Sequence, residues 1–127
     1  MGAHSMIIGY HHAQITVAKD QEPEARKFYC HILGLSEIEK PESLKGRGGF
    51  WVRVGHQELH IGIEEGVDRR KTKAHLAYQV EDLNEVKEKL NAIGIEILDS
   101  IPIPGYERFE CRDPFGNRVE FIQPLDR

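Results

Sequence analysis

Three histidines and one glutamate could form a metal site, because each is the polar residue of a strand whose alternate neighbours are apolar. They are His12 in Tyr10–Ala18, His60 in Glu58–Ile63, His75 in Lys73–Val80 and Glu120 in Val119–Ile122. Side chains of a β-strand alternate between its two faces, so these four point away from the face that packs the core. Three imidazoles and one carboxylate are ligands that suit Zn, Ni, Co, Mn or Fe(II). The sequence therefore predicts a divalent metal site.

The four positions also repeat along the chain. His12 and His75 lie 63 residues apart, and His60 and Glu120 lie 60 residues apart, each on a late strand after a glycine-containing turn. A single strand histidine is more often a half-exposed or hydrogen-bonded side chain than a ligand, and a lone glutamate usually faces solvent. Four such residues at repeated positions favour the metal site over these structural explanations. We expect His11, on the opposite face from His12, to pack in the core.

Two amphipathic helices are expected, one after the first strand of each repeat. Asp20–Pro23 is a helix start with Pro in the first turn, and apolar residues follow at helical spacing up to Gly34. Asp82 with Glu85 resembles a capping box, and the helix that it starts ends at Gly94. Further strands are expected at Phe50–Val54, Glu58–Ile63 and Ile95–Leu98.

The last predicted hairpin positions Glu120. The turn is Asp113–Asn117, in which Pro presets φ and Gly and Asn tolerate positive φ. The residues on both sides alternate, which predicts a β-hairpin over Arg108–Gln123. Val119 and Phe121 then share one face and Glu120 takes the other. This pattern alone leaves open whether the carboxylate faces solvent or a polar cavity.

These elements predict an α+β fold of two βαβββ modules in a single domain. We place the first module at residues 7–64 and the second at residues 72–124, and we interpret residues 1–5 as a cloning remnant. Helices in such a layer arrangement cover one face of the sheet, and the other face is free to curve. The expected architecture is a curved mixed-sheet cup with the helices on its outer face and the four polar side chains inside.

Composition restricts the partners and the location. The chain has 127 residues and a net charge of -4 from mixed signs spread along its length, which argues against nucleic acid as the main partner. No apolar stretch approaches the ~20 residues of a membrane span, and no secretory signal opens the chain. We therefore expect a soluble cytoplasmic protein with no membrane partner, in which Cys30 and Cys111 are free thiols.

Five segments carry a resemblance to a known family. They are HHAQITV, EARKFYCHILGL, QELHIGIEE, AHLAYQVEDL and CRDPFGNRVEF. Together they resemble the vicinal oxygen chelate superfamily, which includes glyoxalase I, fosfomycin-modifying proteins, bleomycin-binding proteins and extradiol dioxygenases. The resemblance covers Ile8 to Pro124 and implies a glyoxalase-like fold, often with cups formed between the subunits of a homodimer. It also implies metal ligands on the first and last strands of each module, which here are His12, His60, His75 and Glu120.

The same resemblance implies a metal-dependent, glyoxalase-like lyase or isomerase that acts on a small oxygenated substrate. An open metal position would bind two adjacent substrate oxygens and stabilise the negative charge that develops on them. Glu120 would be the base that moves a proton between adjacent carbons of a hemithioacetal. His60 stands where such glyoxalases carry a second carboxylate or a glutamine, so it is either a ligand or a catalytic acid–base. The expected substrate-binding residues are Trp51, Arg53, Tyr106 and Arg108.

Three alternatives stay open. In an extradiol dioxygenase, His12, His75 and Glu120 would hold Fe(II) beside His60, but the His and Tyr that those enzymes carry before the DP turn are missing. A fosfomycin-modifying protein would need a cationic pocket for phosphonate. The arginines that could supply it are Arg53, Arg108, Arg112 and Arg118. A bleomycin-binding protein would need no metal ligands, although four buried titratable groups without an ion would be costly.

Overall fold

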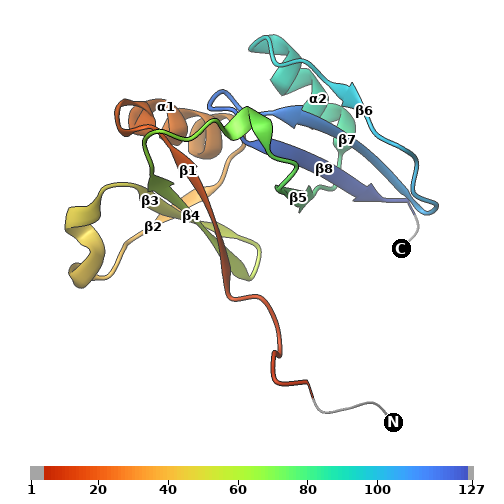
Figure 1. Ribbon diagram of the computed structural model, residues 1–127. Helices are drawn as coiled ribbons and strands as arrows, with labels where there is room; N and C mark the ends of the chain where they lie inside the picture. The colour runs from red at the N-terminus through yellow and green to blue at the C-terminus, as the bar shows by residue number, and fades with distance from the viewer. Residues whose placement is uncertain (1–4, 126–127) are drawn as a thin grey trace.

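The computed structural model describes residues 5–125 and confirms the two βαβββ modules (Figure 1). The expectation that residues 1–5 are a cloning remnant falls, except for Ser5, outside the described residues. The strands of the first module are β1 (His12–Val17), β2 (Ser36–Ile38), β3 (Phe50–Val54) and β4 (Gln57–Ile63). Those of the second are β5 (His75–Gln79), β6 (Leu98–Asp99), β7 (Tyr106–Arg112) and β8 (Arg118–Pro124).

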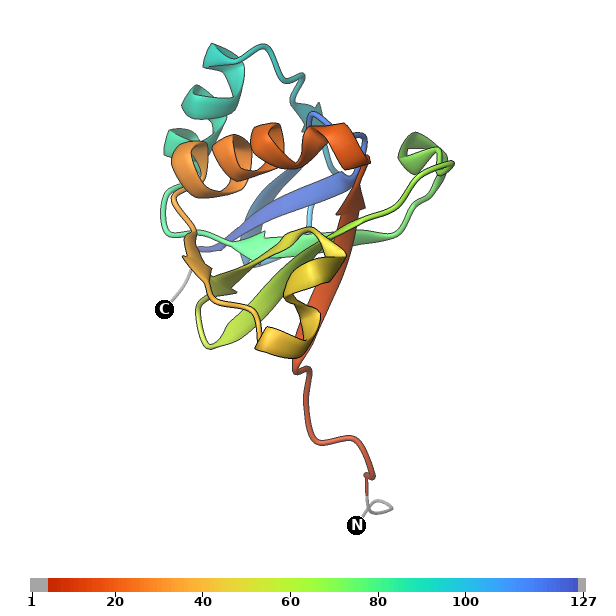
Figure 2. The ribbon, with the colours of Figure 1, turned by 90° about the vertical axis from the view of Figure 1, so that its left-hand side faces the viewer.

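Each module forms its own four-stranded mixed sheet, and the two sheets have the same topology. The strand orders are β1-β4-β3-β2 and β5-β8-β7-β6, so β1 and β5 occupy equivalent edges. In both sheets the first strand is parallel to the last and the other pairings are antiparallel. The helices of both modules lie on the same side of the two sheets (Figure 1 and Figure 2). This arrangement leaves the opposite faces for a site.

The helices begin and end near the predicted residues. The first helical segment runs from a short 3₁₀ turn (Lys19–Gln21) through α1 (Glu22–Arg26) into a π-helical stretch (Lys27–Ile32). In the second module, α2 (Leu83–Ala92) begins with the Asp82 side chain, which accepts bonds from two backbone N–H groups of its first turn. Both segments are followed by glycines of positive φ, Gly34 at 81° and Gly94 at 83°. Two further 3₁₀ segments lie in loops, at Glu42–Arg47 and Arg69–Lys71.

The strand expected at Ile95–Leu98 was wrong in its position. The structure places β6 at Leu98–Asp99, paired with Glu110 and Phe109 of β7. The backbone N–H of Ile95 donates to the carbonyl of Leu90 at the end of α2, so it does not enter the sheet ladder. Ile95 instead packs, partly buried, against the hydrophobic core.

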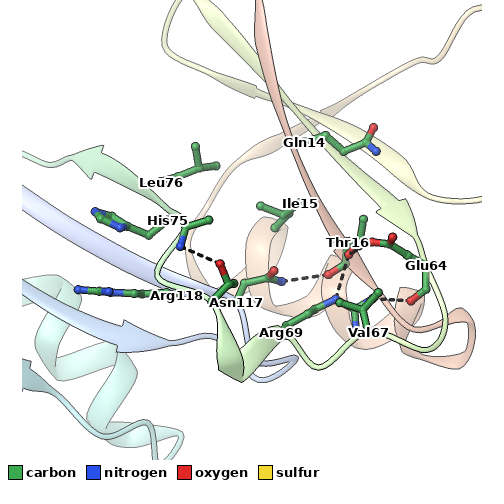
Figure 3. Close-up of a pocket in the computed structure, with 12 residues that line it drawn as sticks. Gln14, Ile15, Thr16, Glu64, Val67, Arg69, His75, Leu76, Asn117 and Arg118 are labelled. Carbon is green, nitrogen blue, oxygen red and sulfur yellow. Dashed lines mark hydrogen bonds between the residues drawn. The ribbon is translucent and has the colours of Figure 1, made fainter.

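Buried polar contacts join the two modules near the Asp113–Asn117 turn. Tyr29, on the helix of the first module, donates from its hydroxyl to Oδ2 of Asp113 at 2.6 Å, and both side chains are fully buried. The Asn117 amide donates to the carbonyl of Thr16 on β1 at 3.0 Å. Arg69, buried in the connection between the modules, donates through Nε to Oγ1 of Thr16 at 2.9 Å (Figure 3). These contacts fix β1 relative to the second sheet.

Two further expectations concern the membrane and the thiols. Across residues 5–125, the structure contains no helix that is long and apolar enough to cross a membrane. Cys30 and Cys111 are free thiols, as expected. Burial raises the pKa of Cys111 to about 12, so this thiol is unreactive at neutral pH.

Candidate functional site

Three aromatic rings form a row on the face of the first sheet that points away from its helix. His60 on β4 is paired with Trp51 on β3 and with Gln14 on β1. The Trp51 and His60 rings are stacked with centroids 3.7 Å apart and planes 1° from parallel. His12 stacks on the other side of His60, with centroids 4.1 Å apart. The two predicted ligands of the first module therefore lie together.

A carboxylate of the same strand binds the buried His60 ring. Nε2 of His60 lies 3.0 Å from Oε1 of Glu58, two residues earlier on β4. The pKa of Glu58 is lowered, mainly by this hydrogen bond from His60. Because His60 lies between two rings and is also bound by Glu58, its orientation is fixed. A concave region of about 540 Å³ adjoins the row and is lined by His12, Trp51 and His60 together with Lys40 and Arg47.

The second sheet brings His75 and Glu120 into direct contact. Nε2 of His75 lies 3.1 Å from Oε1 of Glu120, which is buried on the neighbouring strand β8. The other ring nitrogen of His75, Nδ1, lies 2.9 Å from the backbone carbonyl of Lys73. Thus the second pair of predicted ligands also lies together, on the sheet of the second module.

Glu110 joins this pair and completes a candidate metal group. It lies directly opposite Glu120 in the β7–β8 register. One ligand atom from each of His75, Glu110 and Glu120 lies within 4.8 Å of the others. Within residues 5–125 it is the one group of at least three His, Cys, Asp or Glu side chains that lie close enough together to hold a metal ion. The group includes neither His12 nor His60.

Two arginines balance the two carboxylates. Arg118 donates through Nε and Nη2 to Oε1 of Glu110, at 3.1 and 2.7 Å. Arg108 lies 3.2 Å from Oε2 of Glu120 through Nη1 and 3.8 Å from Oε2 of Glu110. His75 and Arg118 are register neighbours and project in the same direction (Figure 3). The face therefore combines two anionic and two cationic side chains with one imidazole.

The donor set of the second sheet fits a divalent cation. A backbone carbonyl can only accept, so Nδ1 of His75 must carry a proton and, in the neutral ring, Nε2 holds a lone pair. In the neutral ring that lone pair faces the carboxylate of Glu120, which also only accepts while it is ionised, so the contact needs either a second proton on His75 or a metal ion. A cation between the two atoms would satisfy both, and a backbone bond at the second nitrogen is the usual support of a metal-binding histidine. One imidazole and two carboxylates suit Zn, Mn or Fe(II).

Within one chain the four predicted ligands occur as two separate pairs. His12 and His75 line the same cleft of about 440 Å³, which lies between the first strands of the two modules. His12 is exposed, and its Nδ1 lies 3.0 Å from Nδ1 of His11. His11 is also exposed, so the expectation that it packs in the core was wrong, because β1 begins only after it.

The predicted substrate-binding residues are divided between the two sheets. Trp51 and the exposed Arg53 lie on β3, where Arg53 is 3.9 Å from Glu58. Arg108 lies beside Glu120, and Tyr106 is 43% exposed at the start of β7. Arg112, a candidate phosphonate-binding residue, instead donates to backbone carbonyls, two of which belong to the connection between the modules. Its role is structural.

Sequence reasoning missed Glu110 and Glu58 as partners of the site. A signal for Glu110 was present, because pairing across the five-residue turn puts positions 110 and 120 opposite each other. Glu58 is two residues from His60, and residues i and i+2 of a strand share a face. Both carboxylates therefore follow from alternation once the strands are correctly assigned.

Comparisons with known proteins give consistent results. The sequence profile of the Glyoxalase/Bleomycin resistance protein/Dioxygenase superfamily matches residues 9–121. A solved structure assigned to the glyoxalase family, from Bacillus anthracis, is 43% identical with a TM-score of 0.86, over 96% of this chain and 99% of that chain.

More distant structures share the fold. The fosfomycin resistance protein FosX from Listeria monocytogenes, complexed with Mn(II) and sulfate, is 20% identical with a TM-score of 0.73, over 94% of this chain and 92% of that chain. An integron cassette protein of Vibrio cholerae is 21% identical with a TM-score of 0.71, over 95% of this chain and 98% of that chain. A search of the curated proteins found no match.

Proposed function

Because the chain belongs to the Glyoxalase/Bleomycin resistance protein/Dioxygenase superfamily, we propose that it is a divalent-metal-dependent, glyoxalase-like lyase or isomerase. Its substrate is a small oxygenated molecule. The observation that carries the proposal is the ligand group of His75, Glu110 and Glu120, whose donor atoms lie within 4.8 Å of one another on the face away from the helices. The Lys73 carbonyl holds His75 in the tautomer that a metal needs.

The proposed metal ligands are His12, His60, His75 and Glu120; Glu110 stays beside them as the partner of Arg118, which donates to its Oε1. When bound, a divalent ion supplies Lewis acidity to two adjacent substrate oxygens. Glu120 serves as the proton base, since its buried carboxylate faces the same side of the sheet as His75. His60 is the second catalytic residue, and its contact with Glu58 leaves open whether it coordinates the ion or transfers protons. Trp51, Arg53, Tyr106 and Arg108 bind the substrate.

A homodimer would unite the two ligand pairs. His12 and His60 lie on the sheet of one module, and His75 and Glu120 lie on the sheet of the other. The edge strands β1 and β5 carry the first ligand of each pair, so β1 of one subunit beside β5 of another would bring the pairs together. We place this dimer in the cytoplasm.

A second candidate function is modification of a phosphonate, as in a fosfomycin resistance protein. The specific observation that favours it is the presence of Arg108 and Arg118 beside Glu120 and Glu110. The two guanidinium groups already neutralise the two carboxylates, so a divalent ion would leave this face with a net positive charge. An anionic substrate group would then be favoured.

Metal analysis of protein purified without a metal-affinity step tests the main proposal. We expect near-stoichiometric Ni, Zn, Co or Mn in the wild type and loss of most of it in His75→Ala and Glu120→Ala. His56→Ala, in the exposed turn between β3 and β4, is the matched control and should retain its metal. The loaded enzyme should convert a hemithioacetal of a dicarbonyl compound. Full metal content in both ligand variants would refute the site, and iron that is lost in air would favour the dioxygenase.

The shared site has a separate test by mixing variants. His12→Ala and Glu120→Ala homodimers each lack a ligand in both sites. Subunit exchange between them would form heterodimers in which one site is complete, so about a quarter of all sites should regain metal after mixing. If mixing restores no metal although each variant still dimerises, the ligands do not come from two subunits.

A further inference from the structure

Arg108 is held by a backbone carbonyl as well as by the carboxylates of the second sheet. Its Nε and Nη2 both donate to the backbone carbonyl of Ile101, at 3.1 and 2.6 Å. This carbonyl belongs to the loop between β6 and β7. The remaining nitrogen, Nη1, is the one that reaches Oε2 of Glu120 at 3.2 Å. The loop therefore holds the guanidinium in place even if the contact with Glu120 is lost.

Glu120 is fully engaged as the structure stands. Its two oxygens contact His75 and Arg108 separately, and the carboxylate is only 6% exposed. A divalent ion held by His75 and Glu120 would draw on the negative charge of this carboxylate. The ion and the guanidinium would then share one carboxylate, and two cations so close repel each other. Because His75 and Arg108 contact different oxygens of Glu120, the ion would compete with Arg108 for the negative charge of this carboxylate and not for the same oxygen.

Arg118 does not share this property. Two of its nitrogens donate to the same oxygen of Glu110, and within residues 5–125 its side chain donates to no backbone carbonyl. Displacing Arg118 would break its whole interaction with Glu110. Displacing Nη1 of Arg108 would break its contacts with Glu120 and Glu110 but leave its two bonds to the carbonyl of Ile101. Arg108 is therefore the guanidinium that a metal ion can release at the lower cost.

We propose that metal binding weakens the hold of Glu120 on Nη1 of Arg108, so that this nitrogen can bind an oxyanion group of the substrate and the metal ion must bind before the anion. The anion is a phosphonate, phosphate or carboxylate, which would accept a hydrogen bond from Nη1 beside the ion that His75 and Glu120 would hold. This inference rests on the proposed metal site, and it adds the order of binding and the residue that couples the two steps. Before the metal binds, Arg108 is occupied by Glu120 and the anion site is closed.

The experiment measures the binding of two probes, Mn²⁺ alone and methylphosphonate with and without saturating Mn²⁺, by calorimetry. Wild-type protein should bind methylphosphonate at least about tenfold more tightly with Mn²⁺ than without it. In Arg108→Met this gain should fall below about threefold, while the affinity for Mn²⁺ stays equal or increases because a competing cation is gone. Arg108→Lys, which keeps the charge but loses the two-pronged bond to the loop, should retain part of the gain.

Arg26→Met is the matched control. Arg26 also pairs with two carboxylates, Glu22 and Glu37, but it lies on the helix of the first module. This variant should behave as the wild type does with both probes. Circular dichroism melting of each variant verifies that it is folded.

The outcomes separate this inference from the proposed function. Wild-type protein that binds no Mn²⁺ overturns both. Mn²⁺ binding with an unchanged methylphosphonate gain in both Arg108 variants overturns only the role of Arg108. A tenfold or greater loss of Mn²⁺ affinity in Arg108→Met also overturns the inference, because Arg108 would then orient Glu120 for the metal ion instead of competing with it.

Discussion

Replacing Tyr29 with phenylalanine should destabilise the protein by about 2 kcal/mol at neutral pH. Its hydroxyl donates to the buried Asp113 carboxylate at 2.6 Å. A hydrogen bond to a charged group contributes about 1.5–3 kcal/mol, and removal of one oxygen atom leaves no sizeable cavity. The bond joins the helix of the first module to the β7–β8 turn of the second. Its loss therefore also weakens the contact that sets the position of one half of the site relative to the other.

Urea denaturation followed by circular dichroism measures this change. With an unfolding entropy of about 2.1 cal/mol/K per residue, ~2 kcal/mol over this chain corresponds to a melting temperature lower by roughly 7 °C. Tyr10→Phe is the control for the chemical change, since Tyr10 is 90% exposed. That variant should unfold as the wild type does.

The pH dependence makes the test sharper. Burial raises the pKa of Asp113 above its ordinary value, although the hydroxyl of Tyr29 and the donors of Asn117 oppose the shift. At about pH 4 much of this carboxyl is therefore protonated, and the hydrogen bond loses its charge-assisted part. The destabilisation by Tyr29→Phe should be smaller at pH 4 than at pH 7. A loss below about 0.5 kcal/mol at pH 7, or an equal loss at both pH values, would refute the reasoning.

Three further predictions follow from single residues. Folding raises the pKa of Asp113, so its contribution to stability is present at low pH and is lost as the pH rises from about 4 through the raised pKa. The difference in free energy of unfolding between wild type and Asp113→Asn should therefore change in that pH window and be constant above it. Gly49→Ala should lower the free energy of unfolding, measured by urea titration, by more than about 2 kcal/mol, because Gly49 has a φ of 80° and an added Cβ would lie 2.2 Å from a backbone carbonyl of β4. Gly46→Ala is the control, and it should lower the free energy of unfolding much less because the space around Gly46 is open. Iodoacetamide at pH 8 should modify Cys30 before Cys111, because Cys111 is buried and has a pKa of about 12. Peptide mass mapping identifies the modified cysteine, and earlier reaction of Cys111 would contradict its burial.

The sequence by itself determined most of the secondary structure and the faces of most strands, but not the position of β6 or the start of β1. Alternation of apolar and polar residues is a local property with a period of two, so it places His12, His60, His75 and Glu120 on the faces away from the helices without knowledge of the fold. The glycines and the Asp82 cap mark the helix ends for equally local reasons. The repeat then gives the two modules, because each copy contains the same order of elements.

The tertiary structure alone decided which polar side chains touch. The pairing of His75 with Glu120 depends on the parallel register of β5 and β8, whose residues lie 45 positions apart in sequence. The contact of Arg108 with Glu120 likewise depends on the loop carbonyl that orients the guanidinium. Register and loop conformation result from packing over the whole chain, and no local pattern encodes them. For this reason the sequence predicted four candidate metal ligands, whereas their division into two pairs became visible only in the folded chain.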